Sequence, residues 1–69
     1  MTSKEQATII QCLMDYLDRE CNNTGNVPAT EQMDAYLFKG FGVVFENEYL
    51  EELRGVFIEL KHEDENGWR

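Results

Sequence analysis

The sequence contains few of the residues from which small domains build cross-links, metal sites or catalytic centres. Its 69 residues include one proline, one histidine, one tryptophan and two cysteines. Cys12 and Cys21 fall on one predicted helix, about 13.5 Å apart along its axis at 1.5 Å per residue, whereas a disulfide needs Cα atoms within roughly 7 Å. We therefore expect free thiols that cannot cross-link the chain internally.

Catalytic and metal-binding patterns are also scarce. No glycine-rich phosphate loop occurs, and Cys12 has no nearby histidine that would activate it as a nucleophile. His62 neighbours Glu59, Glu63 and Glu65, but no second histidine or cysteine pair stands at metal-ligand spacing. We expect no enzymatic activity, no cofactor and no metal site.

Positive charge is scarce as well, because six basic residues face fourteen acidic ones and give a net charge of -8. Direct binding to nucleic acid or to an anionic membrane needs Lys and Arg, so both are disfavoured. The longest strongly apolar stretch, residues 41–45, is far too short to span a bilayer, and no signal peptide is recognisable. These features predict a cytoplasmic protein whose partner is a protein with a basic surface.

What remains is enough apolar sequence for one small core. Hydrophobic residues make up 42% of the chain, which is not a disordered composition. A chain this short buries only ~60% of the surface that its unfolded form exposes, and such domains often add a second subunit. We expect residues 1–69 to form a single helical domain.

Three segments have the three- and four-residue apolar spacing of amphipathic helices. The first covers residues 4–22 and begins with a capping box from Ser3 to Gln6. The second covers residues 31–39, with Thr30 as N-cap and Gly40 as the stop. The third covers residues 48–63 and is capped by Asn47. Short connections between them predict an all-α fold, a small three-helix bundle.

The expected apolar faces differ between the three segments. They consist of Ile9, Ile10, Leu13, Met14, Leu17 and Cys21 in the first, Met33, Tyr36 and Leu37 in the second, and Tyr49, Leu50, Leu53, Val56, Phe57 and Leu60 in the third. Residues 41–45 favour an extended conformation, and we interpret them as a buried connector. Strand pairing across a dimer and a ligand loop are the alternatives.

The third segment also contains an acidic row, defined as Glu48, Glu52, Glu59 and Glu63. At about 100° per residue these glutamates share one narrow arc, with Glu51 beside them. Repulsion between like charges four residues apart costs a few tenths of a kcal/mol per pair, so stability alone would not select this row. One interpretation is a solvated helix face. The other is a mimic of a phosphate backbone, which Asp15 and Asp18 of the first helix would extend.

Three further residues are candidates for contact with a partner or a second subunit. Ile58 projects away from the apolar stripe of its helix. Gly55 lies one turn before it in the helix interior, where glycine costs ~1 kcal/mol relative to alanine. Packing of residues 41–45 over Ile58 is the alternative. Trp68 stands in a polar tail, either as an exposed binding residue or folded back onto the core.

In size and charge the chain resembles small inhibitors of host proteins that phages or mobile elements encode, including acidic DNA mimics; no single motif carries this resemblance. The leading hypothesis is a non-enzymatic protein that binds a basic protein surface and inhibits or modulates its target. For a phage-encoded protein the location would be the host cytoplasm. The alternative is a structural or regulatory homodimer without a mimicry role.

Overall fold

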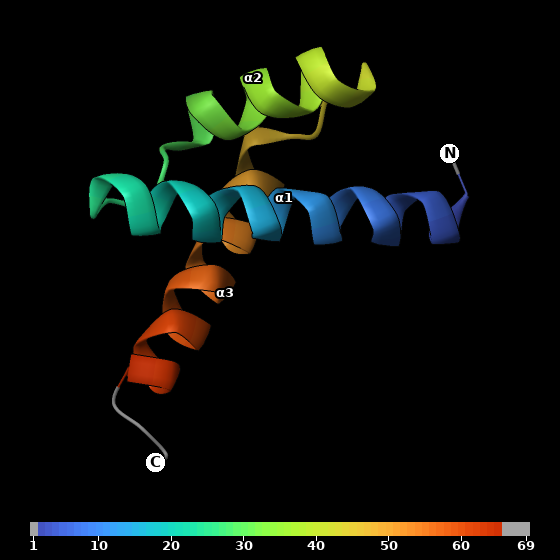
Figure 1. Ribbon diagram of the computed structural model, residues 1–69. Coiled ribbons are helices and arrows are strands. Elements are labelled where there is room, and N and C mark those ends of the chain that lie inside the picture. The colour runs from blue at the N-terminus through green and yellow to red at the C-terminus, as the bar shows by residue number, and fades with distance from the viewer. Residues whose placement is uncertain (1, 66–69) are drawn as a thin grey trace.

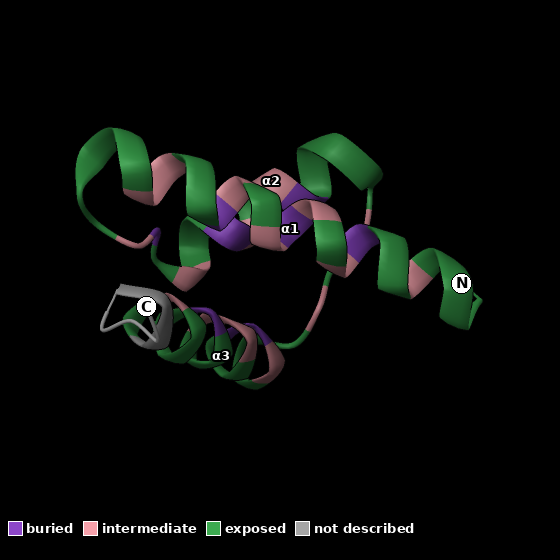
Figure 2. Cartoon of the chain, turned by 60° about the horizontal axis from the view of Figure 1, so that its bottom comes forward, coloured by how far each residue is buried: buried purple, intermediate pink, exposed green. Residues whose placement is uncertain are grey.

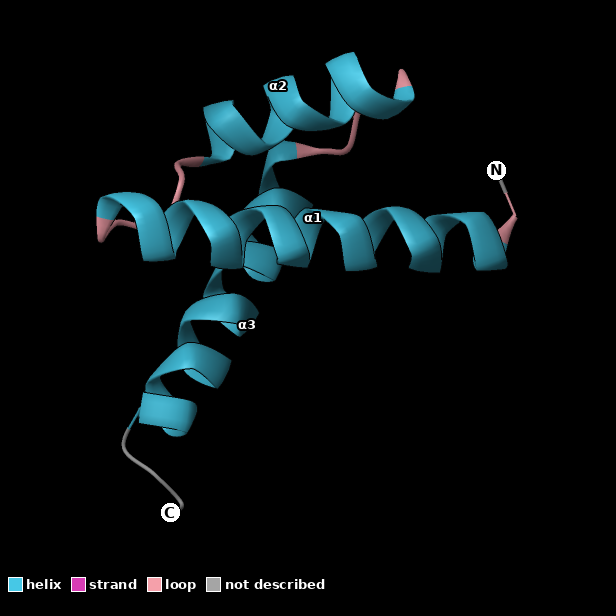
Figure 3. Ribbon diagram, viewed as in Figure 1, coloured by secondary structure: helices cyan, strands magenta, loops and turns pink. Residues whose placement is uncertain are grey.

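The computed structural model describes the backbone of residues 2–65 and the side chains of residues 2–62. This part of the chain forms three α-helices and no strand (Figure 3). They are α1 (Ser3–Thr24), α2 (Thr30–Phe41) and α3 (Asn47–Glu65). The predicted all-α class is confirmed, and each helix extends one to two residues beyond its predicted ends.

The capping box of α1 lies one residue earlier than predicted. Thr2 is the N-cap, and its hydroxyl accepts a hydrogen bond from the Glu5 backbone N–H at 3.1 Å, while the Glu5 carboxylate accepts from the Thr2 N–H at 3.3 Å. The sequence contains two overlapping boxes, one ending in Glu5 and one in Gln6. A carboxylate also interacts favourably with the positive end of the helix dipole, which favours the box that ends in Glu5.

The ends of α2 correct two further predictions. Ala29, not Thr30, is the N-cap. The Ala29 backbone N–H donates a hydrogen bond to the side chain of Gln32 at 3.0 Å. The helix passes through Gly40 and ends at Gly42, whose φ of 68° is left-handed. Glycine adopts this conformation without the steric penalty that a Cβ imposes. Gly40 needs no such conformation and remains helical.

The start of α3 is also one residue earlier than predicted. Asn47 is already helical, and the Leu50 backbone N–H donates to the carbonyl of Glu46 at 3.0 Å. Glu46 therefore occupies the N-cap position, which was predicted for Asn47.

The helices α1 and α2 lie side by side in opposite directions, and α3 crosses them (Figure 1). Their shared core consists of Ile9, Leu13, Leu17, Met33, Leu37, Leu50 and Phe57. Figure 2 shows buried segments of the three helices facing one another, while the side of α3 turned away from α1 and α2 is exposed. The core therefore lies where the N-terminal half of α3 passes the other two helices.

The segment after α2 is less buried than predicted. Phe41 belongs to the last turn of α2 and is exposed, and Val44 is 70% exposed. Val43 and Phe45 pack against the core, and the Phe45 ring meets that of Tyr49 edge-on at 5.4 Å. Beyond the end of α2, alternation along an extended segment turns every second side chain outward, so Val43 and Phe45 face the core and Val44 does not.

Arg54 joins α3 to the loop between α1 and α2. Its Nε donates to the carbonyl of Pro28 at 2.7 Å, and its Nη2 donates to the carbonyl of Val27 at 3.2 Å. Pro28 is buried, so these loop carbonyls lie close to the core and gain a charged donor there. Arg54 thus has a structural role that its sequence position did not reveal.

The two cysteines are free, as predicted, and both are half-buried. Within residues 2–65, none of the helices combines the length and the apolarity that crossing a bilayer requires.

Candidate functional site

The described part of the acidic row lies on the outer surface of α3. Glu48, Glu52 and Glu59 are all exposed. None of the three makes an ion pair or side-chain hydrogen bond with a residue that the structure describes. Glu63 belongs to α3, but its side chain lies outside the described residues. Over this stretch, α3 presents carboxylates to solvent without a neighbouring cation.

Glu51 lies on a different part of the helix surface from this row. It borders a hollow with Ala29, Thr30 and Arg54 at the start of α2. One residue along a helix is a rotation of about 100°, so Glu51 and Glu52 point in different directions. A partner seated on the acidic row would not contact both equally.

Asp18 does not extend the row as a free charge, because it forms an ion pair with Lys61. The Lys61 ammonium lies 3.2 Å from a carboxylate oxygen of Asp18 and also donates to the side chain of Asn22 at 3.2 Å. At about 100° per residue, Lys61 lies across the helix from the acidic row, on the side where it contacts α1. Asp18 is thus paired with a cation in the described part of the chain, and its role as an extension of the row stays a prediction.

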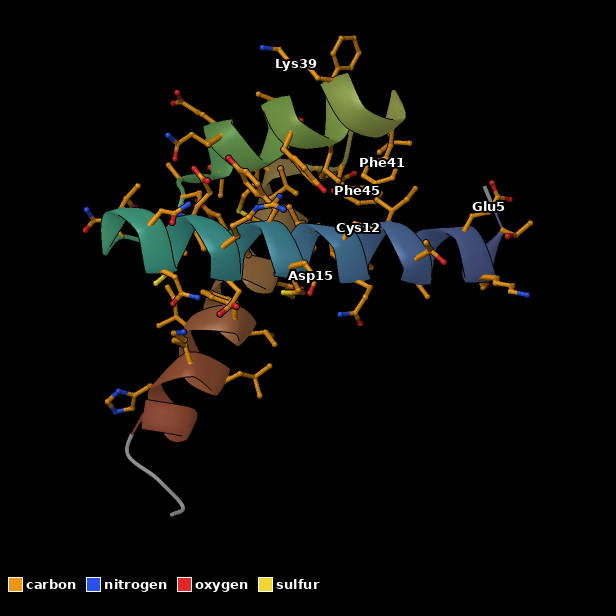
Figure 4. The ribbon with its side chains drawn as sticks, in the orientation of Figure 1. Glu5, Cys12, Asp15, Lys39, Phe41 and Phe45 are labelled. Atoms are coloured by element: carbon orange, nitrogen blue, oxygen red, sulfur yellow. The ribbon has the colours of Figure 1, made fainter. Side chains whose placement is uncertain are left out.

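Asp15 is exposed and borders a groove between α1 and α3. In Figure 4 it lies on the side of α1 from which the C-terminal half of α3 projects. The groove has a volume of about 370 Å³ and is lined by Met14, Asp15, Asp18, Phe57, Leu60 and Lys61. Its walls thus combine apolar side chains with the two aspartates of α1.

The apolar stripe of α3 is only partly covered by the other two helices. Leu50 and Phe57 are buried, but Val56 is 47% exposed and Leu60 is 57% exposed. The cause is the crossing of the helices: the C-terminal half of α3 extends past α1 and α2 (Figure 1). Val56 and Leu60, one turn apart, form an exposed apolar strip next to the groove.

The other predicted contact residues lie elsewhere. Ile58 is 40% exposed, so residues 41–45 leave it accessible. A Cβ built on Gly55 would meet nothing within 4 Å, so this surface is open to an approaching helix. A subunit contact through Gly55 and Ile58 stays a prediction. Trp68 lies outside the described residues.

His62 is exposed near the end of α3. Among the described residues, no group of three histidine, cysteine or carboxylate side chains is placed to hold a metal ion. The side chains of Glu63 and Glu65 lie outside that part, so the expectation of no metal site stays a prediction.

Sequence reasoning missed the groove and the exposed apolar strip. The sequence of α3 nevertheless contains an indication that Val56 lies at the edge of the apolar stripe. Glu52 precedes Val56 by four residues, and Glu59 follows it by three. Residues at these spacings are neighbours on a helix surface. An apolar residue with acidic neighbours on the helix surface lies at the edge of the apolar stripe. Whether such a residue is buried depends on where the neighbouring helix packs.

No family model matches the chain, and comparisons with curated proteins and with solved structures found no match.

Proposed function

We propose that the protein is a non-enzymatic interaction protein that binds a basic surface of a protein target and thereby inhibits or modulates it. The observation that supports this proposal is the exposure of Glu48, Glu52 and Glu59 on α3 without a cation beside them in the described part of the chain. The net charge of -8 acts in the same direction, because it attracts basic surfaces over distances of several ångströms.

The mechanism would be occlusion. A rigid helix holds the carboxylates at fixed spacing, so the target neutralises them without first ordering a flexible segment. Lys and Arg side chains engaged in this way are no longer available to phosphates, and a target that normally binds nucleic acid would be blocked as by a DNA mimic. Such binding should be fast and should weaken steeply with salt.

The test is charge reversal on the row followed by affinity capture from a cell extract. We expect wild-type protein to retain basic proteins that elute as salt rises. The variant carrying Glu48→Lys, Glu52→Lys and Glu59→Lys should lose them, because each reversal replaces an attraction by a repulsion. Quantitative mass spectrometry of both eluates measures the difference.

The control is a variant with Glu20→Lys and Glu31→Lys, which moves the net charge in the same direction on α1 and α2. It should keep most of the captured proteins, and circular dichroism should show native helicity for both variants. Retention of the same proteins by the reversed row, or an equal loss in the control, would reject a specific role for the row.

A further inference from the structure

The groove between α1 and α3 has an apolar surface with acidic residues on both helices beside it, whereas the acidic row lies on α3 alone. Its apolar surface comes from Met14, Phe57 and Leu60, and Val56 continues it along α3. Asp15 and Asp18 border it on α1. On α3, Glu52 and Glu59 flank Val56 at helix spacings of four and three residues.

This arrangement places carboxylates on both sides of an apolar strip. Around the axis of α3, at 100° per residue, Leu60 is followed by Val56 and then by Glu52 and Glu59. Asp15 belongs to the opposite wall, where it shares the groove with Leu60. Asp18 forms an ion pair with Lys61. Among the described residues, the acidic groups of this surface without an ion pair are therefore Asp15 on one side and the two glutamates on the other.

We infer that this groove binds an amphipathic helix whose apolar side is flanked by Lys or Arg. An inserted helix presents apolar side chains at spacings of three and four residues, which suit the strip formed by Val56 and Leu60. Basic residues beside that apolar side then meet Asp15 on one edge and Glu52 and Glu59 on the other. The inference rests on the proposed function and specifies the chemistry of its partner.

Charge decides between this occupant and a second copy of the chain. Two copies packed through the same groove would bring Asp15 and the two glutamates of each molecule close to those of the other. Like charges facing across an interface oppose association, and each copy has a net charge of -8. A basic helix instead gains attraction from the same carboxylates.

One hollow that is larger than the groove shows no comparable preference for a charged ligand. It has a volume of about 600 Å³ and lies between the N-terminal turns of α1 and the segment after α2, lined by Lys4, Glu5, Thr8, Ile9, Phe41 and Val43. Figure 4 shows Phe41 on the side of α2 that faces α1. Its two charged residues have opposite signs, so it selects no charge in a ligand.

The test uses synthetic helical peptides as probes and fluorescence anisotropy as the measurement. The first peptide has leucine on one side and lysine on the other, the second has glutamate in place of lysine, and the third has glutamine in place of leucine. We expect the leucine–lysine peptide to bind most tightly. Amide shift changes in the labelled protein should centre on Met14, Val56 and Leu60.

Two variants test the groove and one serves as the control. Val56→Ser with Leu60→Ser removes the apolar strip, and Asp15→Asn with Glu59→Gln removes charge from both edges. We expect each double variant to weaken the affinity for the leucine–lysine peptide by about tenfold or more, since central apolar anchors and matched charges dominate such interfaces. Phe38→Ser with Val44→Ser removes exposed apolar side chains of α2 and the connector, and should change affinity less than about twofold.

The outcomes separate this inference from the proposed function. Equal binding of the lysine peptides with and without leucine would overturn the inference that the groove binds the apolar side of a helix. Binding would then be purely electrostatic. Equal weakening by the Phe38 and Val44 control would also overturn this inference. Sedimentation showing a dimer that Leu60→Ser dissociates would identify a second copy as the occupant. Absence of binding by every lysine peptide would count against both proposals.

Discussion

Tyr16 stacks on Tyr36 with ring centroids 4.3 Å apart and ring planes 9° apart, which joins α1 to α2 at the edge of the core. Burial raises the pKa of Tyr16 above the ordinary tyrosine value, and the carboxylate of Glu20 raises it further. The folded chain therefore holds this phenol proton more tightly than the unfolded chain does. The raised pKa of Tyr16 thus makes the stability of the fold sensitive to alkaline pH.

The sign of this dependence follows from the raised pKa. The contribution of Tyr16 is complete below the unfolded tyrosine pKa of about 10, and it is lost as pH rises through the higher folded value. We expect urea unfolding to show a falling free energy of unfolding above about pH 10. Tyr16→Phe, which keeps the ring but has no ionisable proton, should reduce that fall. Tyr49→Phe is the control, and an equal effect of both changes would contradict the assignment to Tyr16.

Burial of single residues could be predicted from the sequence, whereas their long-range hydrogen bonds could not. The free cysteines and the buried Met33 and Leu37 were predictable, because helix rise and apolar spacing are local properties. The hydrogen bonds of Arg54 to Val27 and Pro28 were not, because they join residues more than 25 positions apart. Nothing in the local sequence around Arg54 distinguishes it from a surface arginine.

At the scale of elements, the two glycines near the end of α2 allow a matched comparison. Gly42 is left-handed, with φ at 68°, whereas Gly40 is helical and a Cβ there would meet nothing within 4 Å. Gly40→Ala should raise the free energy of unfolding by ~0.5 to 1 kcal/mol, and Gly42→Ala should lower it by ~1 to 2 kcal/mol. Urea unfolding of both variants measures the two changes. Equal signs would contradict the helix end placed at Gly42.

The helices themselves were predictable, and their ends were less so. Each predicted segment lies within one observed helix, because apolar spacing is repeated over several turns. The ends depend on a choice between competing local signals, such as the boxes ending in Glu5 and Gln6, or Gly40 and Gly42 as the stop. In both cases the sequence offered two chemically suitable residues. The helix dipole favours the box that ends in Glu5, and the left-handed conformation that ends α2 is adopted by Gly42.

At the scale of the whole molecule, the direction of α3 determines the candidate surface. The stripe of α3 was readable from sequence, but its coverage was not, since this depends on how α3 crosses the other two helices. That crossing buries Leu50 and Phe57 and leaves Val56 and Leu60 exposed. The exposure of Glu48, Glu52 and Glu59 agrees with their helix spacing, whereas the exposure of the apolar strip beside them depends on how the helices cross.

The net charge of -8 also makes the acidic row a source of instability for the whole molecule. Glu52 follows Glu48 by four residues and Glu63 follows Glu59 by four, and like charges at this spacing on a helix repel each other. Glu52→Gln with Glu59→Gln should raise the free energy of unfolding by ~0.5 kcal/mol, or Tm by ~2 to 4 °C. Glu48→Gln is the matched control and should lower stability, because Glu48 stands in the first turn of α3, where the helix dipole favours negative charge.

Salt provides an independent measurement of the same repulsion. Raising ionic strength from about 0.01 M to about 0.15 M shortens the screening length from ~30 Å to ~8 Å. Thermal unfolding of the wild type should therefore shift to higher temperature with salt, and that of the Glu52 and Glu59 double variant should shift less. A double variant less stable than wild type would show that these glutamates support folding. The opposite result would show that they oppose folding, as expected for a row that stability alone would not select.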